Sequence, residues 1–312
     1  MMLLIKKWYI ALLIIFSPLI AQDINGKVVF AYTDKEEAES FALKRVYLTF
    51  SKVISEELSV KIQTDVDSES SPQNIYLKNA KADWKTLNGT VVIGLQGMNM
   101  FKIQEMNWGK RYLGKTVMDR FQYSSSADMG IGYYHSKDKL HGSILMTNGT
   151  GYKKSEDDSH KKLSLQLIYG NSKLSKSDGF NVGAVFSHEP YEREGEVGIP
   201  EQPTGEHNKK VFGVFGGYAK NNLRIGAEWN QLEDSGLLAG NYNDNLSSFY
   251  INYAFNPKNT LVMKHDMVSG NKDANYTLVA VEFAPTKGLM VAPNVRSDGD
   301  SNTLGVNFQF AF

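Results

Sequence analysis

Alternation of apolar and polar residues recurs along almost the whole of this 312-residue chain. In the stretch NLRIGAEWN (222–230), every second residue is apolar. A repeat of two is the period of a β-strand, in which successive side chains point to opposite faces. The pattern therefore predicts an all-β protein. Sixteen such segments can be read, approximately at 26–32, 42–51, 57–66, 75–85, 90–97, 126–136, 140–147, 161–170, 179–187, 209–218, 223–231, 247–255, 260–266, 274–284, 289–296 and 303–312.

The connections between these segments are mostly long and short in turn. The clearest long ones are 98–125, 148–160, 188–208 and 232–246, whereas the short ones are turn-forming clusters such as LNG, KDK, AKNN, NPKN and PTKG. Asn, Gly and Pro favour tight turns between antiparallel strands. The alternation predicts an up-and-down meander with its long loops on one rim, and with its turns and both termini on the other.

A meander of this size has two open edges, which invite pairing with other chains unless the sheet closes on itself. A closed barrel of about 16 strands encloses a water-filled lumen rather than a packed core. Polar residues then face inward and apolar residues face lipid, where a closed barrel pairs every backbone group. We therefore expect a transmembrane antiparallel up-and-down β-barrel of 16 strands, or of 14 if 26–32 is not a strand and a weak neighbour drops out. A soluble β-sandwich or propeller is the competing interpretation, although no blade repeat of about 40 residues occurs.

The first 21 residues have the layout of a secretory signal peptide, with Lys6 and Lys7 before an apolar run that ends near Ala21. An N-terminal membrane anchor is the alternative, but the apolar run is short for a span of about 20 residues. Residues 22–312 would then form the barrel, in the outer membrane of a double-membraned bacterium. The chain has no cysteine, so disulfides cannot hold it together, and its 34 basic and 34 acidic residues do not suit nucleic acid.

Aromatic residues recur near the ends of the predicted strands. A ring with one apolar and one polar edge suits the boundary between lipid and water. The residues of this belt are Tyr47, Phe50, Tyr76, Trp84, Tyr133, Tyr169, Phe186, Tyr218, Trp229, Phe255 and Phe283.

The chain ends on the stretch TLGVNFQFAF, in which Phe308, Phe310 and Phe312 share one face. We expect this last strand to close the barrel against the first strand. The alternation that runs to a terminal phenylalanine also resembles the C-terminal signal of outer-membrane proteins. This resemblance implies that the barrel-assembly machinery reads it.

The whole pattern resembles that of sixteen-stranded bacterial outer-membrane porins, and within them the group related to the phosphate-selective porins O and P. The stretches that carry the resemblance are FALKRVYLTFSKVISEELSVKIQTDVD (41–67), YLKNAKADW (76–84), GLQGMNMFKIQEMNWGKR (94–111) and SADMGIGYYH (126–135). They cover roughly the N-terminal third of the chain. Phosphate is not carried over, because the chain has no conspicuous ladder of lysine or arginine residues.

The third long connection, 98–125, is also the longest. In the porins that the chain resembles, the third long loop typically folds into the barrel and narrows the pore, and the resemblance implies that role here. Apolar residues such as Phe101 and Met118 could pack against the wall, whereas an ordinary external loop with a solvated basic face is the alternative. The charged residues of the loop are Lys102, Glu105, Lys110, Arg111, Lys115, Asp119 and Arg120, a net charge of +3.

Strand parity assigns a set of charged side chains to the inward face. The basic members are Arg45, Lys61, Arg224, Lys264 and Arg296, and the acidic members are Asp65, Asp128, Glu228, Asp266 and Glu282. The two signs balance on the wall, so together with a basic loop they predict at most a mild preference for anions. The alternative is that these residues merely pair and hydrate a wide lumen.

Other constellations point less clearly to chemistry. His141 and Ser143 match the His-x-Ser pair of outer-membrane phospholipases, but parity turns both inward, whereas that family's pair faces lipid. Ile144 also stands where that family has Asn. EDDSH (156–160) and HEPYERE (188–194) could hold a cation, although both fall in predicted loops, where charged runs are usually solvated. We therefore predict no enzymatic activity, no metal and no cofactor.

Two classes of function follow from these predictions. The first is an outer-membrane porin, a water-filled channel for the passive diffusion of small hydrophilic solutes or ions. The second is a plugged barrel that serves as a binding or structural platform. The expected partners are outer-membrane lipid, the barrel-assembly machinery and the diffusing solutes. The resemblance also implies a homotrimer, because sixteen-stranded porins are usually trimers.

Overall fold

Sixteen β-strands and two short helices make up the computed structural model, which describes residues 22–34, 40–67, 72–156, 158–193, 205–236, 242–299 and 301–312. The predicted signal peptide, 1–21, lies outside the described residues. The helices are α2 (Lys102–Trp108) and α3 (Val117–Arg120). The strands are β1 (Gln22–Asp34), β2 (Ser40–Val53), β3 (Leu58–Val66), β4 (Ile75–Thr86), β5 (Gly89–Gly97), β6 (Ala127–Lys137), β7 (Leu140–Thr147), β8 (Lys162–Gly170), β9 (Gly179–Arg193), β10 (Gly205–Lys220), β11 (Leu223–Asp234), β12 (Tyr242–Asn256), β13 (Asn259–Gly270), β14 (Ala274–Thr286), β15 (Leu289–Ser297) and β16 (Asn302–Ala311).

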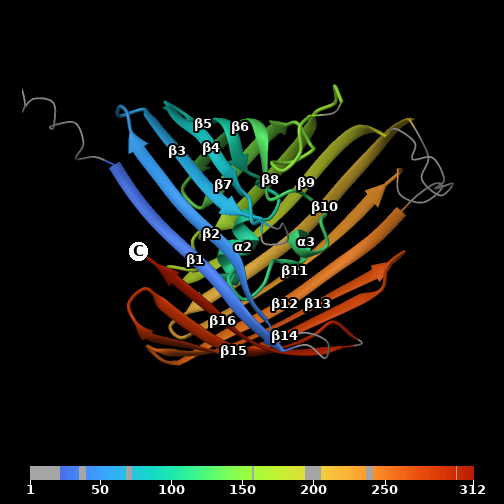
Figure 1. Cartoon of the computed structure of the whole chain (residues 1–312). Helices are drawn as coiled ribbons and strands as arrows, with labels where there is room; N and C mark the ends of the chain where they lie inside the picture. The colour runs from blue at the N-terminus through green and yellow to red at the C-terminus, as the bar shows by residue number, and fades with distance from the viewer. Residues whose placement is uncertain are drawn as a thin grey trace, which may run out of the picture.

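The strands form one closed barrel in which each strand pairs with its neighbours in the sequence and β1 pairs with β16 (Figure 1). The closing pair is antiparallel, with Phe30 opposite Phe308. Beyond the strand end, the Gly26 N–H donates to the Phe312 carbonyl at 2.9 Å, and the Phe312 N–H donates back at 3.1 Å. The prediction of a closed antiparallel barrel of 16 strands is confirmed, and the 14-stranded alternative is not needed.

Several strands run further than the alternation predicts. β9 continues to Arg193 rather than ending near 187, and β10 begins at Gly205 rather than near 209. The added residues, such as Glu189 and Asn208, are polar on both faces of the strand. Beyond the lipid band both faces of a strand meet water, so the backbone ladder continues after the period of two has disappeared. The predicted long loops 188–208 and 232–246 therefore lie partly on strands, since 188–193, 205–208, 232–234 and 242–246 belong to β9, β10, β11 and β12.

Apolar side chains cover the outside of the barrel. In β8, outward residues such as Leu163 and Leu165 are exposed, while the intervening residues are buried. Most of the predicted aromatic belt is likewise outward, but Tyr47 and Tyr76 face the interior. Tyr47 accepts a hydrogen bond from Arg45, and the ring of Tyr76 lies 5.5 Å from that of Tyr152. Among the described residues, no helix has the length and apolar character needed to cross a bilayer.

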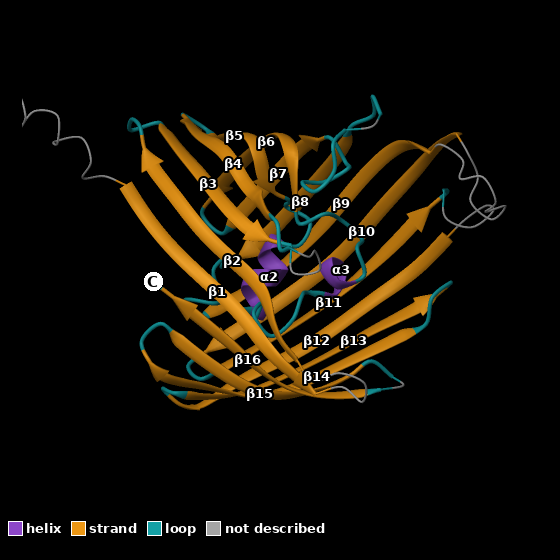
Figure 2. Cartoon of the chain, in the orientation of Figure 1, coloured by secondary structure: helices purple, strands orange, loops and turns teal. Residues whose placement is uncertain are grey.

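The connection between β5 and β6, residues 98–126, lies inside the barrel and carries both helices (Figure 2). We call it the inner loop. Its apolar residues pack against inward-facing apolar residues of the wall in two clusters. In the first cluster, Met100, Phe101 and Met118 of the inner loop meet residues of β8–β13 such as Leu246. In the second cluster, Trp108, Tyr112 and Leu113 meet Val29, Tyr250, Val262, Tyr276, Leu278, Ala280 and Ala292.

Candidate pore constriction

The inner loop owes its shape to a short amphipathic helix with a glycine at its end. α2 buries Ile103 and Trp108, which belong to the two apolar clusters. Gly109 ends the helix with a φ of 67°, and its N–H donates to the Glu105 carbonyl. This left-handed conformation is the usual one at a helix C-terminus and favours glycine. The chain can therefore reverse at Gly109 and run back across the interior.

One set of polar contacts ties the middle of the inner loop to the last strands. Lys110 forms an ion pair of 2.6 Å with Glu282 of β14, and the Tyr112 hydroxyl donates to the same carboxylate at 2.8 Å. The Tyr112 carbonyl accepts a hydrogen bond from Asn307, and the Leu113 carbonyl accepts one from Arg296. These contacts hold the loop against β14–β16.

A second set holds the segment that follows. Lys264 of β13 donates to the Lys115 carbonyl at 2.9 Å and pairs with Asp266. Arg120 lies 3.6 Å from Asp266, and its guanidinium carbon stands 3.3 Å from the centre of the Tyr276 ring. A cation over an aromatic face is stabilised by the ring quadrupole, more so when little water reaches it. α3 is thereby fixed to β13 and β14.

Amide side chains anchor the start of the loop and α2. Asn107 and Asn181 of β9 exchange two hydrogen bonds, of 2.7 and 2.8 Å. Gln166 of β8 donates to the Asn99 carbonyl at 2.6 Å. Both pairs are buried, where neutral hydrogen bonds resist competition from water. The inner loop is therefore attached to β8–β16 along most of its length and leaves the interior beside β1–β6 less filled.

The face of the inner loop turned toward β1–β6 carries a charged cluster. Arg111 donates to Glu105 at 2.8 Å and also pairs with Asp119. Across the interior, Arg45 of β2 pairs with Asp65 of β3 at 3.2 Å. These five residues are contributed by two strands and one loop, and both arginines are held by carboxylates that fix where their charge lies.

Two cavities meet at Arg111. The loop-side cavity has a volume of about 500 Å³, and Arg45, Tyr76, Arg111 and Arg296 are among its lining residues. The turn-side cavity has a volume of about 700 Å³, and Tyr47, Lys61, Lys102 and Arg111 are among its lining residues. Because Arg111 lines both, the two cavities adjoin each other beside this guanidinium.

Basic residues dominate the lining of both cavities. The acidic lining residues are Asp67, Asp83, Glu105 and Asp298. The basic ones are Lys27, Lys44, Arg45, Lys61, Lys78, Lys81, Lys102, Arg111, Lys115, Arg120, Lys153 and Arg296. Acidic and basic residues balance over the whole wall but are not evenly distributed. The basic residues outnumber the acidic ones in the lining of the two cavities.

The predicted loop charges divide into two groups. Lys110 and Arg120 are engaged with the acidic residues Glu282 and Asp266 of the wall, and Arg120 also lines the loop-side cavity. Lys102, Glu105, Arg111 and Lys115 line the two cavities, and Asp119 holds Arg111. Burial, and then the charge of Lys81, lowers the pKa of Lys102, and burial likewise lowers the pKa of Lys115.

The predicted wall charges also divide. Arg45, Lys61 and Arg296 line the cavities. Asp65, Asp128, Glu228, Lys264, Asp266 and Glu282 face inward but are at most 6 % exposed. Of these, Lys264, Asp266 and Glu282 bond to the inner loop, Asp128 accepts the Gly149 N–H at 2.7 Å, and Glu228 accepts a hydrogen bond from Asn230. Arg224 lies between Ala219 and Asn252 in the sheet and lines neither cavity.

Sequence reasoning missed two groups of residues. Lys27, Lys78 and Lys81 line the turn-side cavity but were not among the predicted inward charges. The inward apolar residues that receive the inner loop, such as Ile168 and Val185, were missed as well. The signal was present, since an apolar residue on an otherwise polar strand face needs a partner inside the barrel.

The pair His141 and Ser143 is not arranged for catalysis. The ring nitrogens of His141 contact the Ser136 hydroxyl at 2.9 Å and the Gly170 carbonyl at 3.1 Å, whereas the Ser143 hydroxyl accepts a hydrogen bond from Asn99. Glu189, which lies in the predicted cation segment 188–194, pairs instead with Lys162 at 2.6 Å. In the described part of the chain, no group of three His, Asp or Glu side chains is placed to hold a metal ion.

The fold is shared with solved outer-membrane barrels. No protein-family model matches the chain, and no curated protein sequence is detectably similar to it. A loop L8 deletion mutant of OmpT, an outer membrane protein of Vibrio cholerae, is 16% identical, with a TM-score of 0.67 over 93% of this chain and 99% of that one. OmpF of Salmonella typhi, solved in complex with daunomycin, is 14% identical (TM-score 0.66, covering 93% and 97%).

An anion-selective porin from Comamonas acidovorans is also similar in structure. It is 10% identical, with a TM-score of 0.67 over 94% of this chain and 99% of that one. These identities are low, so the likeness establishes the architecture and not the solute. The chain therefore has the closed sixteen-stranded barrel fold that solved bacterial outer-membrane proteins share, which is the architecture that its sequence predicts.

Proposed function

We propose that this chain is an outer-membrane porin, a water-filled channel for the passive diffusion of small hydrophilic solutes or ions, with a preference for anions. The carrying observation is the pair of cavities that meet at Arg111 with an excess of cations in their lining. In a narrow, partly desolvated passage a charge acts at a lower effective dielectric than in bulk water. The local excess then matters more than the balance over the whole wall.

The inner loop sets the width of the passage in this proposal. Its two sides are unequal, since apolar clusters and ion pairs bind it to β8–β16, while its Arg111 side faces β1–β6. Glu105 and Asp119 hold Arg111 in one orientation, which keeps a positive charge at the narrow point. Lys102 and Lys115 extend this charge into the cavities on either side.

Single-channel recording in a planar bilayer tests this function. The full-length mature barrel should conduct ions. Its reversal potential in a salt gradient should show that anions are more permeant than cations. Deleting 104–120 should raise the conductance because the narrow point is removed, and Arg111→Ala should raise it with a smaller disturbance of the fold. Lys139→Ala, in the exposed turn 138–139, is the matched control. A barrel that is folded but does not conduct would contradict the proposal.

The finer assignments are part of the same proposal. The resemblance of 41–67 and 94–111 supports a relation to the phosphate-selective porin O and P group, without phosphate as the solute. One similar structure is described as a trimer form of OmpT from Vibrio cholerae, which supports a homotrimer here. The barrel-assembly machinery would read Phe308, Phe310 and Phe312. Cross-linking of the folded protein in detergent would test the trimer.

The packing of the inner loop also supports the second candidate, a plugged barrel that acts as a binding or structural platform. Residues such as Trp108 and Met118 are fully buried inside the barrel, so much of the interior is filled. The conductance measurement separates the two candidates, because a platform would bind ligands while passing no measurable current.

A further inference from the structure

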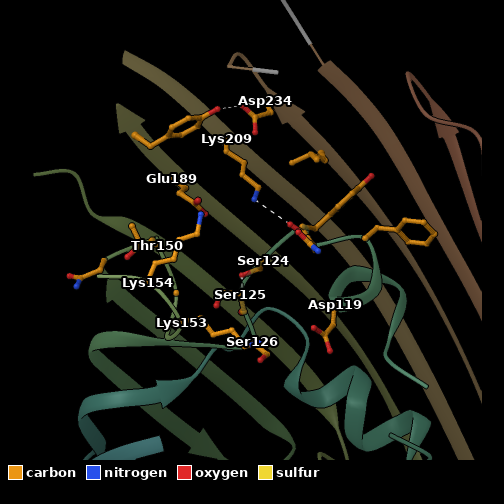
Figure 3. Close-up of a pocket in the computed structure, with 18 of the residues that line it drawn as sticks. Asp119, Ser124, Ser125, Ser126, Thr150, Lys153, Lys154, Glu189, Lys209 and Asp234 are labelled. Atoms are coloured by element: carbon orange, nitrogen blue, oxygen red, sulfur yellow. Dashed lines mark hydrogen bonds between the residues drawn. The ribbon is translucent and has the colours of Figure 1, made fainter. Parts of the chain in front are cut away.

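A third cavity, of about 960 Å³, opens on the long-loop side over β9–β13 (Figure 3). Its lining includes Phe121 and Tyr123 of the inner loop, together with Leu232 and Val268 of the wall. These four residues belong to, or pack against, the first apolar cluster, which also holds Met100 and Met118. We call this space the vestibule pocket. Packed apolar side chains form part of its floor, and it shares Lys115, Tyr152 and Lys153 with the loop-side cavity.

Two carboxylates line one side of the vestibule pocket. Asp234 of β11 and Asp244 of β12 are 5% and 2% exposed. Asp234 stands opposite Tyr242 in the sheet, two residues from Asp244, so the two residues are diagonal neighbours, with Cβ atoms about 7 Å apart. The Tyr191 hydroxyl donates to Asp234 at 2.6 Å, and the Tyr242 hydroxyl donates to Asp244.

Neither carboxylate has a cationic partner within 4 Å among the described residues. Lys162, nearby, pairs with Glu189 at 2.6 Å, and Lys209 donates to the Gln122 carbonyl at 3.4 Å. Lys272 contributes its backbone N–H to Asp244, while its ammonium stands 5.4 Å from the centre of the Phe121 ring. Two buried carboxylates without an ion pair are costly, and a cation from solution would offset that cost.

An unpartnered hydroxyl lies on the same side. Tyr123 is 2% exposed and lines the vestibule pocket, and its hydroxyl makes no hydrogen bond within the described part of the chain. Burial, and then the charge of Asp244, raises the pKa of Tyr123, so the hydroxyl keeps its proton. A buried hydroxyl is nearly always hydrogen-bonded, so its lack of a protein partner points to one from a ligand. A primary ammonium carries three N–H donors, which match two carboxylates and one phenolic oxygen.

The other side of the vestibule pocket is basic. Lys153 and Lys154 come from the connection between β7 and β8, and Figure 3 shows both across the cavity from Asp234. Lys154 is exposed and takes part in no ion pair within the described ranges, and Lys153 reaches Asp67 only at 3.8 Å. Ser124, Ser125 and Ser126 also line the pocket, but Ser124 and Ser125 already donate to the backbone carbonyls of Ser125 and Ala127. The two ammonium groups suit a carboxylate, which accepts hydrogen bonds from them.

We propose that the vestibule pocket binds zwitterionic solutes of the amino-acid and short-peptide class, with their ammonium group between Asp234 and Asp244 and their carboxylate at Lys153 and Lys154. Binding in the pocket is measured without any current, so this proposal does not depend on whether the barrel conducts. A non-conducting barrel could bind a peptide, and a conducting one could fail to bind it.

Calorimetric titration of the full-length folded barrel in detergent with Ala-Ala-Ala tests the proposal. The free tripeptide should bind, and N-acetyl-Ala-Ala-Ala and Ala-Ala-Ala-amide, which each lack one charge, should bind roughly tenfold more weakly or worse. If the amide binds as tightly as the free tripeptide, the pocket is a cation site and the proposal is overturned. If the acetylated peptide binds as tightly, the carboxylate pair plays no part and the proposal is equally overturned.

Paired variants assign each half of the site. Asp234→Asn with Asp244→Asn should weaken the free and amidated peptides and leave the acetylated one unchanged. Lys153→Gln with Lys154→Gln should weaken the free and acetylated peptides and leave the amidated one unchanged. Asp34→Asn, which removes an exposed carboxylate at the end of β1, is the matched control. Folding of each variant is checked by its heat-modifiable migration in gels. If binding persists unchanged in both double variants, the peptide is held elsewhere and the proposal is refuted; the capped peptides test it on the unaltered protein even if a variant does not fold.

Discussion

Lys110 Nζ lies 2.6 Å from Oε1 of Glu282, although the two residues are 172 positions apart in the chain. The same carboxylate accepts a hydrogen bond from the Tyr112 hydroxyl. Glu282 is buried, so little water competes for these contacts. Glu282 of β14 is therefore one of the anchors that hold the inner loop against β14–β16 next to Arg111.

Removal of this anchor should destabilise the barrel. Glu282→Ala leaves Lys110 and Tyr112 without their partner, and breaking a buried pair from one side costs about 3 kcal/mol. Urea titration of the full-length barrel in detergent measures the loss. The double variant Lys110→Ala with Glu282→Ala should lose less than the sum of the single variants, because it leaves no unpaired charge. Strict additivity would show that the two side chains do not interact.

Lysines beside the open passage should set its ion preference. Lys61 and Lys102 line the turn-side cavity, and neither is in an ion pair within 4 Å among the described residues. Replacing both with glutamine should shift the reversal potential in a salt gradient toward cations, since each lost charge weakens the attraction for anions in the narrow passage. Lys139→Gln, in the exposed turn 138–139, should leave it unchanged. An unaltered reversal potential in the double variant would place these lysines outside the conduction path.

Outward residues at mid-strand should tolerate no charge. Leu165 lies in the middle of β8, is exposed, and has outward neighbours Ile144 and Phe186 on the adjacent strands. Leu165→Lys should reduce folding into lipid vesicles, because lysine at the bilayer midplane of a barrel costs about 2–4 kcal/mol. Leu87→Lys makes the same change in a fully exposed two-residue turn and should fold normally. Equal folding yields for the two variants would show that Leu165 does not face lipid.

Phe312 should matter more for assembly in cells than for the folded barrel. Its backbone exchanges two hydrogen bonds with Gly26, which Phe312→Ala keeps, while its ring is largely exposed. The substitution should therefore lower the amount of barrel in the outer membrane of cells and leave refolding from urea into detergent almost unchanged. Deleting Phe312 also removes the backbone pairing and should impair both. Normal assembly of Phe312→Ala in cells would show that the ring of Phe312 is not part of the assembly signal.

The strand order, the closure and the outward face follow from the sequence by itself. Alternation with a period of two appears wherever one strand face meets lipid and the other does not, so segments such as 161–170 and 223–231 were predictable to within a few residues. The same reasoning fails where both faces meet water, which is why β9 and β10 run six and four residues beyond their predicted ends at 187 and 209. A ladder of backbone hydrogen bonds there leaves no trace in side-chain polarity.

Which inward-facing side chains are covered by the inner loop, and which line open space, depends on the tertiary structure. Parity turns Lys264, Asp266 and Lys61 inward alike, but it does not say which of them the inner loop covers. The loop reaches Glu282 and Asp266 across more than a hundred residues of sequence, and those contacts depend on the closed barrel bringing β13 and β14 beside α3. Once the loop packs on that side, Arg111, Lys61 and Lys102 are left beside the open space. Local polarity determines which way a side chain points, whereas the neighbours it meets depend on chain closure over long distances.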